Sequence, residues 1–240
     1  MKELLKWSSY ERLNCFPSKC NCEPMRIGEV ILQPLAVITS IPYSVVGYLT
    51  LRKIDKENGD IKLKILAWVF IFQGFASAFL HSSFISYSRY MDWGAIFAIF
   101  SWLNALVIFK GKSLRVFLLA WLVLTFIPTY VLSLFKDQFI IIFLVYAGIS
   151  MYFLRKHMIE NKQTKQSMKY LKTALGLLLI GGICFLMDLK RLFCVEEFHL
   201  YGHSFWHVLT ALSMFQIFNY FLFHQETNLE THEETYIQTF

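Results

Sequence analysis

Charged residues divide this chain into long apolar segments. Seven segments contain no Asp, Glu, Lys or Arg: 30–51, 65–88, 93–109, 116–135, 138–154, 173–187 and 198–224. An α-helix needs about 20 apolar residues to cross the hydrocarbon core of a bilayer, with a range of roughly 17–25. Only 173–187 falls short, and it is flanked by Lys172 and Lys190, whose aliphatic stems can reach toward the membrane interfaces. The pattern therefore predicts seven membrane-spanning helices.

The composition supports an all-α, polytopic membrane bundle. Hydrophobic residues make up 56% of the chain and Phe alone occurs 24 times, more than a soluble domain of this size usually carries. The first 29 residues are polar and of mixed charge and show no signal-peptide core, so we expect the first span to act as the insertion signal. We predict an extracytoplasmic N-terminal segment (1–29), a seven-helix transmembrane domain (30–224) and a cytoplasmic tail (225–240).

The distribution of Lys and Arg predicts the orientation. Three connections carry five, three and six basic residues, namely 52–64, 110–115 and 155–172. The alternate connections carry one, one and two, at Arg89, Lys136 and Lys190–Arg191. Because cytoplasmic loops are the basic ones, we expect the C-terminus in the cytoplasm and the N-terminus outside, lumenal or periplasmic. Five basic residues in the N-terminal segment run against this orientation. The net charge of +6 arises mostly in these loops and gives no reason to expect nucleic-acid binding.

Histidines recur at helical spacing in the apolar segments. His203 and His207 are four residues apart and share one helix face, and so do Ser77 and His81. Ionisable side chains inside membrane helices are costly, rare and usually functional. Three imidazoles with an open fourth position form the ligand set of a catalytic zinc site. These residues are therefore candidates for a metal centre.

The predicted topology brings these candidates to one depth in the membrane. The second span runs outward and ends near His81, the third starts on the outer side at Asp92, and the seventh starts there at His203. We therefore expect all of them near the outer leaflet. Simpler roles exist for single residues, since Asp92 can cap the third helix and Ser77 can hydrogen-bond to its own helix.

The remaining histidines and the tryptophans have lesser expected roles. His199 is a weaker ligand candidate. We expect the others in loops or the tail, without a role: His157, His224 and His232. Trp93 and Trp206 either join the aromatic belt at the interface or line a cavity that lipid can reach.

The order and spacing of these residues resemble the alkaline ceramidase family. The motifs are Ser77-x-x-x-His81, Asp92, His203-x-x-x-His207 within Gly-His-Ser-Phe-Trp-His, Cys22-Glu23, Gln33-Pro34, and Asp188 to Arg191 followed by Cys194. The resemblance extends from about residue 20 to 223. The family belongs to a superfamily of seven-span membrane hydrolases that also includes the adiponectin-type receptors. Its members cleave the amide of ceramides into a fatty acid and a sphingoid base.

The resemblance implies a zinc ion on His81, His203 and His207, with Asp92 and Ser77 as catalytic residues. A zinc-activated water would attack the amide, Asp92 would act as base and then as acid, and Ser77 would donate to the oxyanion. The implied partners are a membrane lipid, ceramide or a related lipid amide, and the bilayer itself.

The resemblance also implies a disulfide between Cys22 and Cys194. The predicted topology puts both on the outer side, where a disulfide can persist. Cys184 falls within a span and is expected as a buried thiol. Cys15 and Cys20 either pair with each other or stay free.

The N-terminal loop departs from the family pattern. Eukaryotic members bind calcium there, with a Glu at the start of the first span among the ligands, and Gln33 occupies that position here. Glu23 remains and Glu29 is a further candidate ligand, but calcium needs several, mostly anionic, oxygens. We therefore expect no tight calcium site. The usual Ser-Asn pair of the first span is Thr39-Ser40 here, and these departures bear on the substrate more than on the zinc chemistry.

Two other functions fit parts of the pattern. The first is a lipid receptor or lipid-binding protein with a structural zinc site. The second is a metal or proton transporter, which needs a polar path across the bilayer. The inner half of the bundle offers Gln216 and Asn219 but no carboxylate. The presence of Asp92 and Ser77 beside the candidate ligands favours the hydrolase.

Overall fold

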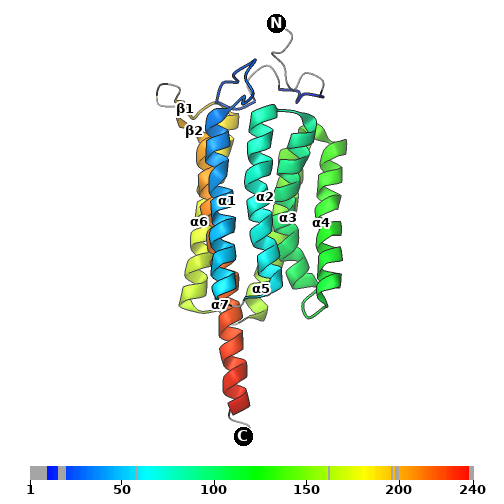
Figure 1. The fold of residues 1–240 in the computed structure, drawn as a ribbon, viewed down its shortest axis with the longest axis vertical. Coiled ribbons are helices and arrows are strands. Elements are labelled where there is room, and N and C mark those ends of the chain that lie inside the picture. The colour runs from blue at the N-terminus through cyan, green and yellow to red at the C-terminus, as the bar shows by residue number, and fades with distance from the viewer. Residues whose placement is uncertain are drawn as a thin grey trace.

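The computed structural model describes residues 10–15, 20–57, 59–161, 163–195, 197 and 200–237, with side chains up to residue 224. The described part is a bundle of seven helices (Figure 1): α1 Pro34–Lys56, α2 Ile61–Ser83, α3 Ser86–Ile108, α4 Leu114–Leu134, α5 Phe139–Glu160, α6 Lys165–Leu189 and α7 Gly202–Ile237. A short 3-10 turn, η1 (Lys136–Gln138), precedes α5, and strands β1 (Cys194–Val195) and β2 (Leu200–Tyr201) pair antiparallel before α7. Helices α1 to α6 are long and apolar enough to cross a membrane. The chain is an all-α polytopic membrane bundle, as the sequence predicts.

Helices α2, α3 and α7 carry most of the buried side chains of the bundle. Helix α1 packs against α2 and α7, and α3 packs against α2, α4 and α5. These contacts bury large aromatic side chains of the core, among them Phe70, Phe97, Trp102, Phe218 and Tyr220. Helices α4 and α5 instead expose many apolar side chains, including Leu119, Phe126, Ile141 and Leu144. These exposed apolar faces suit contact with hydrocarbon. Most buried polar side chains instead belong to α2, α3 and α7.

Polar caps fix where two of the helices begin. Asp60 accepts a hydrogen bond from the Lys62 backbone nitrogen at 3.0 Å and caps α2. Thr164 and Ser167 form a reciprocal capping box at the start of α6. Helix α6 therefore starts well before the uncharged run 173–187, which explains how a short apolar run becomes a helix of 25 residues.

The end of the bundle at which α1 begins, called here the N-terminal end, is closed by covalent and main-chain links. One disulfide joins Cys22 to Cys194 and a second joins Cys15 to Cys20. Cys184 is free and half-buried rather than fully buried. The backbone of residues 11–13 pairs with the turn between α2 and α3, where Leu13 N donates to Phe84 O at 3.1 Å. The N-terminal segment is therefore held against the helix ends.

The boundary between α2 and α3 differs from the prediction, which placed the start of the third span at Asp92. Phe84 adopts a left-handed conformation (φ 49°) and ends α2, and α3 begins at Ser86. Asp92 therefore lies inside α3 and does not cap it. Charged residues do not mark the helix boundary here, because Arg89 and Asp92 both have partners within the protein. Arg89 donates to Lys136 O and lies 5.1 Å from the Phe139 ring centroid, and Asp92 is buried.

Two histidines expected in loops or the tail lie in helices instead. His157 belongs to α5 and His224 to α7, and their ring centroids are 6.0 Å apart at the end of the bundle opposite the N-terminal end. His199 and the side chain of His232 lie outside the described residues. The backbone of α7 continues to Ile237, so the predicted start of the tail at residue 225 does not coincide with a helix end.

Gly202, the first residue of α7, permits close contact with α6. An added Cβ would overlap the Cys184 carbonyl oxygen and lie 3.1 Å from the Asp188 Cβ. We predict that Gly202→Ala displaces the start of α7 and lowers the thermal unfolding midpoint of the detergent-solubilised protein by several degrees. Gly176→Ala in α6 is the matched control, because nothing lies within 4 Å of its added Cβ and Ala favours helix over Gly by about 1 kcal/mol. Equal midpoints for both variants would contradict the packing described.

Candidate metal centre

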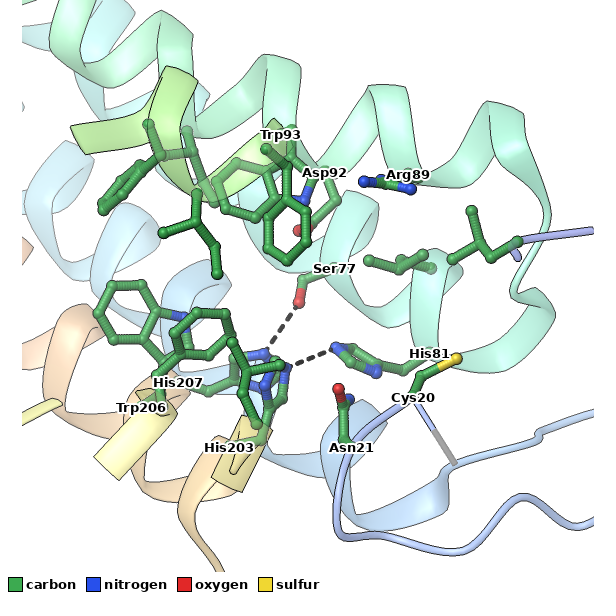
Figure 2. A pocket seen from close by; sticks show the side chains of 18 of the residues that line it. Cys20, Asn21, Ser77, His81, Arg89, Asp92, Trp93, His203, Trp206 and His207 are labelled. Atoms are coloured by element: carbon green, nitrogen blue, oxygen red, sulfur yellow. Dashed lines mark hydrogen bonds between the residues drawn. The ribbon is translucent and has the colours of Figure 1, made fainter. Parts of the chain in front are cut away.

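Three histidine side chains meet inside the bundle near its N-terminal end (Figure 2). His81 lies in the last turn of α2, whereas His203 and His207 lie in the first turns of α7. One ring nitrogen of each lies within 4.8 Å of the other two, and His203 Nε2 is 3.1 Å from His81 Nε2. His81 and His207 are buried and His203 is half-buried. This group could hold a metal ion.

Ser77 and Asp92 lie beside the histidines (Figure 2). Ser77 Oγ is 3.4 Å from His207 Nε2. Asp92 projects from α3, is buried, and lines the same cavity as Ser77. The structure thus brings together the five candidate residues of the sequence.

Helix α1 contacts the His207 ring through Thr39. Thr39 Oγ1 is 3.1 Å from His207 Nδ1, and the same hydroxyl lies 3.0 Å from Leu35 O. Because Leu35 O can only accept, the Thr39 hydroxyl donates to it and accepts from the Nδ1–H of His207. The lone pair of His207 Nε2 is then directed toward Ser77 and the other two histidines. Thr39, which stands where the family pattern has Ser, is therefore in direct contact with a candidate ligand.

Gln73 is a site residue that the sequence reasoning missed. Its Nε2 donates to Asp92 Oδ1 at 2.8 Å, while its buried Oε1 has no partner among the described residues. Gln73 precedes Ser77 by four residues, as Ser77 precedes His81. A polar residue at every fourth position of an otherwise apolar helix was the signal that could have identified it.

Asp188 connects the site to the N-terminal segment. This fully buried carboxylate at the end of α6 accepts from Cys22 N and from His203 N, each at 2.9 Å. It therefore fixes the first turn of α7, which carries two candidate ligands, against the loop that carries the Cys22–Cys194 disulfide.

The histidines line a cavity of about 380 Å³. The N-terminal segment covers it at one end, through Leu13 to Cys15, Cys20 and Asn21. Its lining also includes Leu144 of α5 and Leu186 of α6, which are 61% and 50% exposed on the outside of the bundle. The cavity thus reaches the surface that would face hydrocarbon. Trp93 and Trp206 line this cavity.

A second cavity of about 100 Å³ lies deeper in the bundle. Both cavities share Tyr43, Ile96, Phe143 and Trp206 in their walls. Apolar side chains dominate the lining of the deeper cavity, with Ile99 and Leu103 of α3 among them. The two cavities together offer a polar reaction centre next to space suited to a hydrocarbon chain.

The acidic side chains of the N-terminal loop are engaged or exposed. The Glu23 carboxylate accepts from Leu35 N at 2.8 Å and from Ala36 N at 2.9 Å, so it caps the start of α1. Burial raises the pKa of the Glu23 carboxyl, and these two hydrogen bonds act in the opposite direction. Glu29 is exposed and Gln33 is fully buried. Across the described residues, only the three histidines form a group of at least three His, Cys, Asp or Glu side chains close enough to share an ion.

The fold and the site define the class: a seven-helix membrane protein with a buried three-histidine group in a cavity that reaches the hydrocarbon-facing surface. Comparison with protein-family models matches residues 27–240 to the family described as Ceramidase. The chain belongs to this family, which confirms the resemblance seen in the site residues. A search of curated proteins found no match.

We predict that the purified protein contains about one zinc ion per chain and that replacing any of the three histidines with Ala releases it. Each substitution removes a nitrogen ligand, and the two that remain hold zinc far more weakly. Elemental mass spectrometry of the purified variants measures the zinc content. His224→Ala is the control, because His224 lies at the opposite end of the bundle. Unchanged zinc content in the His203 and His207 variants would reduce these residues to a packing role.

We also predict that calcium does not stabilise the protein. Both Glu23 oxygens already accept backbone hydrogen bonds, and Gln33 supplies no negative charge. Thermal unfolding in millimolar calcium and in a calcium-selective chelator should give the same midpoint. A higher midpoint in calcium that disappears in Glu23→Gln would contradict this expectation.

Proposed function

We propose that this protein is a zinc-dependent intramembrane amidase that cleaves the N-acyl amide of ceramide, or of a related lipid amide, into a fatty acid and a sphingoid base. One observation carries the proposal: three imidazole nitrogens, Asp92 and Ser77 converge in one cavity that reaches the lipid-facing surface. Membership in the ceramidase family supports this substrate class.

The donor set fits zinc. Neutral imidazole nitrogen is a preferred zinc ligand, and three such ligands leave a coordination position for water or substrate. His81 Nε2 and His203 Nε2 lie 3.1 Å apart, so either His203 carries a proton on Nε2 and donates it to His81, or both nitrogens carry lone pairs that a cation between the rings would bind. Zinc held by His81, His203 and His207 would lower the pKa of a water molecule to about 7 and polarise the amide carbonyl.

Asp92 is the proposed proton carrier. Gln73 holds one of its carboxylate oxygens, which fixes the plane of the group and leaves the second oxygen for proton transfer. Asp92 would take a proton from the attacking water and then deliver it to the nitrogen of the leaving amine. The amine would otherwise leave as a strongly basic anion, so this second transfer is needed for C–N cleavage.

Ser77 is the proposed donor to the oxyanion. Its neighbour Ser40 lies 3.0 Å away and donates its own proton to Ala36 O at 2.8 Å. Ser40 therefore accepts from the Ser77 hydroxyl, and we infer that this hydroxyl turns from Ser40 to the substrate oxygen as negative charge develops there. A donor aimed at the developing negative charge lowers the barrier of acyl transfer.

The cavities suit a lipid with two chains and a small polar head. We infer that such a lipid enters between α5 and α6, past Leu144 and Leu186, because both side chains line the cavity and are exposed. One chain would occupy the deeper cavity beside Ile99 and Leu103. The polar head would then lie toward the N-terminal end, where Arg89 contributes to the cavity wall.

We further propose that the N-terminal end faces the outside or lumen. The connections α1–α2, α3–α4 and α5–α6 lie at the opposite end and carry most of the basic residues, as cytoplasmic loops do. Two disulfides at the N-terminal end suit an oxidising compartment. The reaction would then occur near the outer leaflet.

The hydrolase accounts for more of the site than the alternatives do. A receptor with a structural zinc site needs the three histidines but gives no role to a buried carboxylate held by Gln73 beside them. A transporter needs polar groups along the bundle axis, whereas the cavity beneath the site is mainly apolar.

We predict that Asp92→Asn retains zinc but loses about 100- to 10,000-fold in ceramide turnover, because Asn keeps the shape of the side chain but cannot accept the proton. Fatty acid release, followed by mass spectrometry, measures the turnover. The control is Asp55→Asn, an exposed carboxylate that pairs with Lys64 at the opposite end of the bundle. Turnover retained by Asp92→Asn would remove Asp92 from the reaction.

A further inference from the structure

We propose that Gln33 is a positioning residue that determines which nitrogen of His81 faces the metal centre. Its side-chain amide links His81 to the N-terminal segment. The identity of the metal rests on the proposed function, whereas the orientation of His81 rests on the hydrogen bonds alone.

Main-chain hydrogen bonds fix the location of Gln33. This residue immediately precedes α1, is fully buried, and its backbone nitrogen donates to His81 O at 3.0 Å. The preceding residue, Leu32, donates to Ser82 O at 3.2 Å. The start of α1 is therefore attached to the end of α2, which places Gln33 next to His81.

The partners of the Gln33 side chain fix the direction of its amide. Nε2 lies 2.7 Å from Glu23 O, and a carbonyl oxygen can only accept, so the NH₂ group faces Glu23. Oε1 consequently faces the other way, 2.9 Å from His81 Nδ1. Asn21 Nδ2 lies 3.3 Å from the same Oε1 and supports this direction.

The amide direction then fixes the tautomer of His81. Oε1 can only accept, so His81 Nδ1 carries the proton and His81 Nε2 carries the lone pair. That Nε2 is the nitrogen 3.1 Å from His203 Nε2, within the candidate centre. A hydrogen bond of this kind raises the basicity of the ligand and holds its ring, and loss of such a partner typically weakens metal binding 10- to 100-fold.

Glu23 presents the carbonyl that orients Gln33. Its carboxylate caps α1 through Leu35 N and Ala36 N, and its own carbonyl receives the Gln33 amide. The N-terminal loop therefore acts on the metal centre through neutral hydrogen bonds. Glu at position 33 could still accept from His81 but could not donate to Glu23 O, so Gln33→Glu separates the two contacts of the side chain.

The test is zinc affinity, measured by competition with a chromophoric chelator on the full-length protein in detergent. We expect Gln33→Met to weaken zinc binding about 10- to 100-fold, and Gln33→Glu to bind more tightly than Gln33→Met because it retains an acceptor. The control is Gln163→Met. Gln163 also donates to a backbone carbonyl, Asn161 O at 2.8 Å, and faces a histidine, His224 at 3.3 Å, but at the opposite end of the bundle. Wild-type affinity in Gln33→Met would overturn the proposal.

A second readout does not depend on zinc or on turnover. Spectra of metal-free protein carrying ¹⁵N-labelled histidine, with the His81 signal assigned by its loss in His81→Gln, should show the proton on Nδ1. A proton on Nε2 would overturn the proposal even if Gln33→Met failed to fold. Wild-type protein that binds no zinc but shows the Nδ1 proton would instead contradict the proposed function and leave the positioning role supported.

Discussion

In a bundle surrounded by hydrocarbon, each buried polar group must find its partner within the protein. Most buried polar groups near the N-terminal end meet this constraint. Gln73 holds Asp92, while Asp188 accepts from Cys22 N and His203 N, and Glu23 caps α1. The exception is the group of three imidazoles, whose nitrogens face one another with no carboxylate or carbonyl oxygen of the described residues between them. A bound cation would satisfy all three nitrogens at once, and the surrounding hydrogen bonds would then serve to hold the rings in place.

Much of this site was predictable because it depends on local periodicity. The spacing of His203 and His207, and of Ser77 and His81, places each pair on one helix face, and the alternation of spans brings the helix ends together. The uncharged runs likewise predict the seven helices. Both inferences rest on the 3.6-residue turn and on bilayer thickness, and neither requires knowledge of side-chain packing.

Other features depend on partners that are distant in the sequence. The predicted start of α3 was wrong because charged residues were taken to mark a helix end, whereas Arg89 and Asp92 have partners within the protein. His157 and His224 were wrongly expected in loops or the tail for the same reason. His157 lies in α5 and His224 in α7, and their rings face each other. Gln33 stood out only as a missing calcium ligand. Its contacts with Glu23 and His81 follow from how α1 meets α2, which its local sequence does not reveal.

The central claim is that the three histidines hold a zinc ion that serves amide cleavage. The most direct measurement is mass-spectrometric profiling of lipids after incubation of the purified, zinc-loaded protein with a mixture of ceramides, other lipid amides and lipid esters. The prediction is loss of ceramide or another lipid amide, with fatty acid and the matching amine released in equal amounts. Zinc-loaded protein that leaves every lipid in the mixture intact would contradict it.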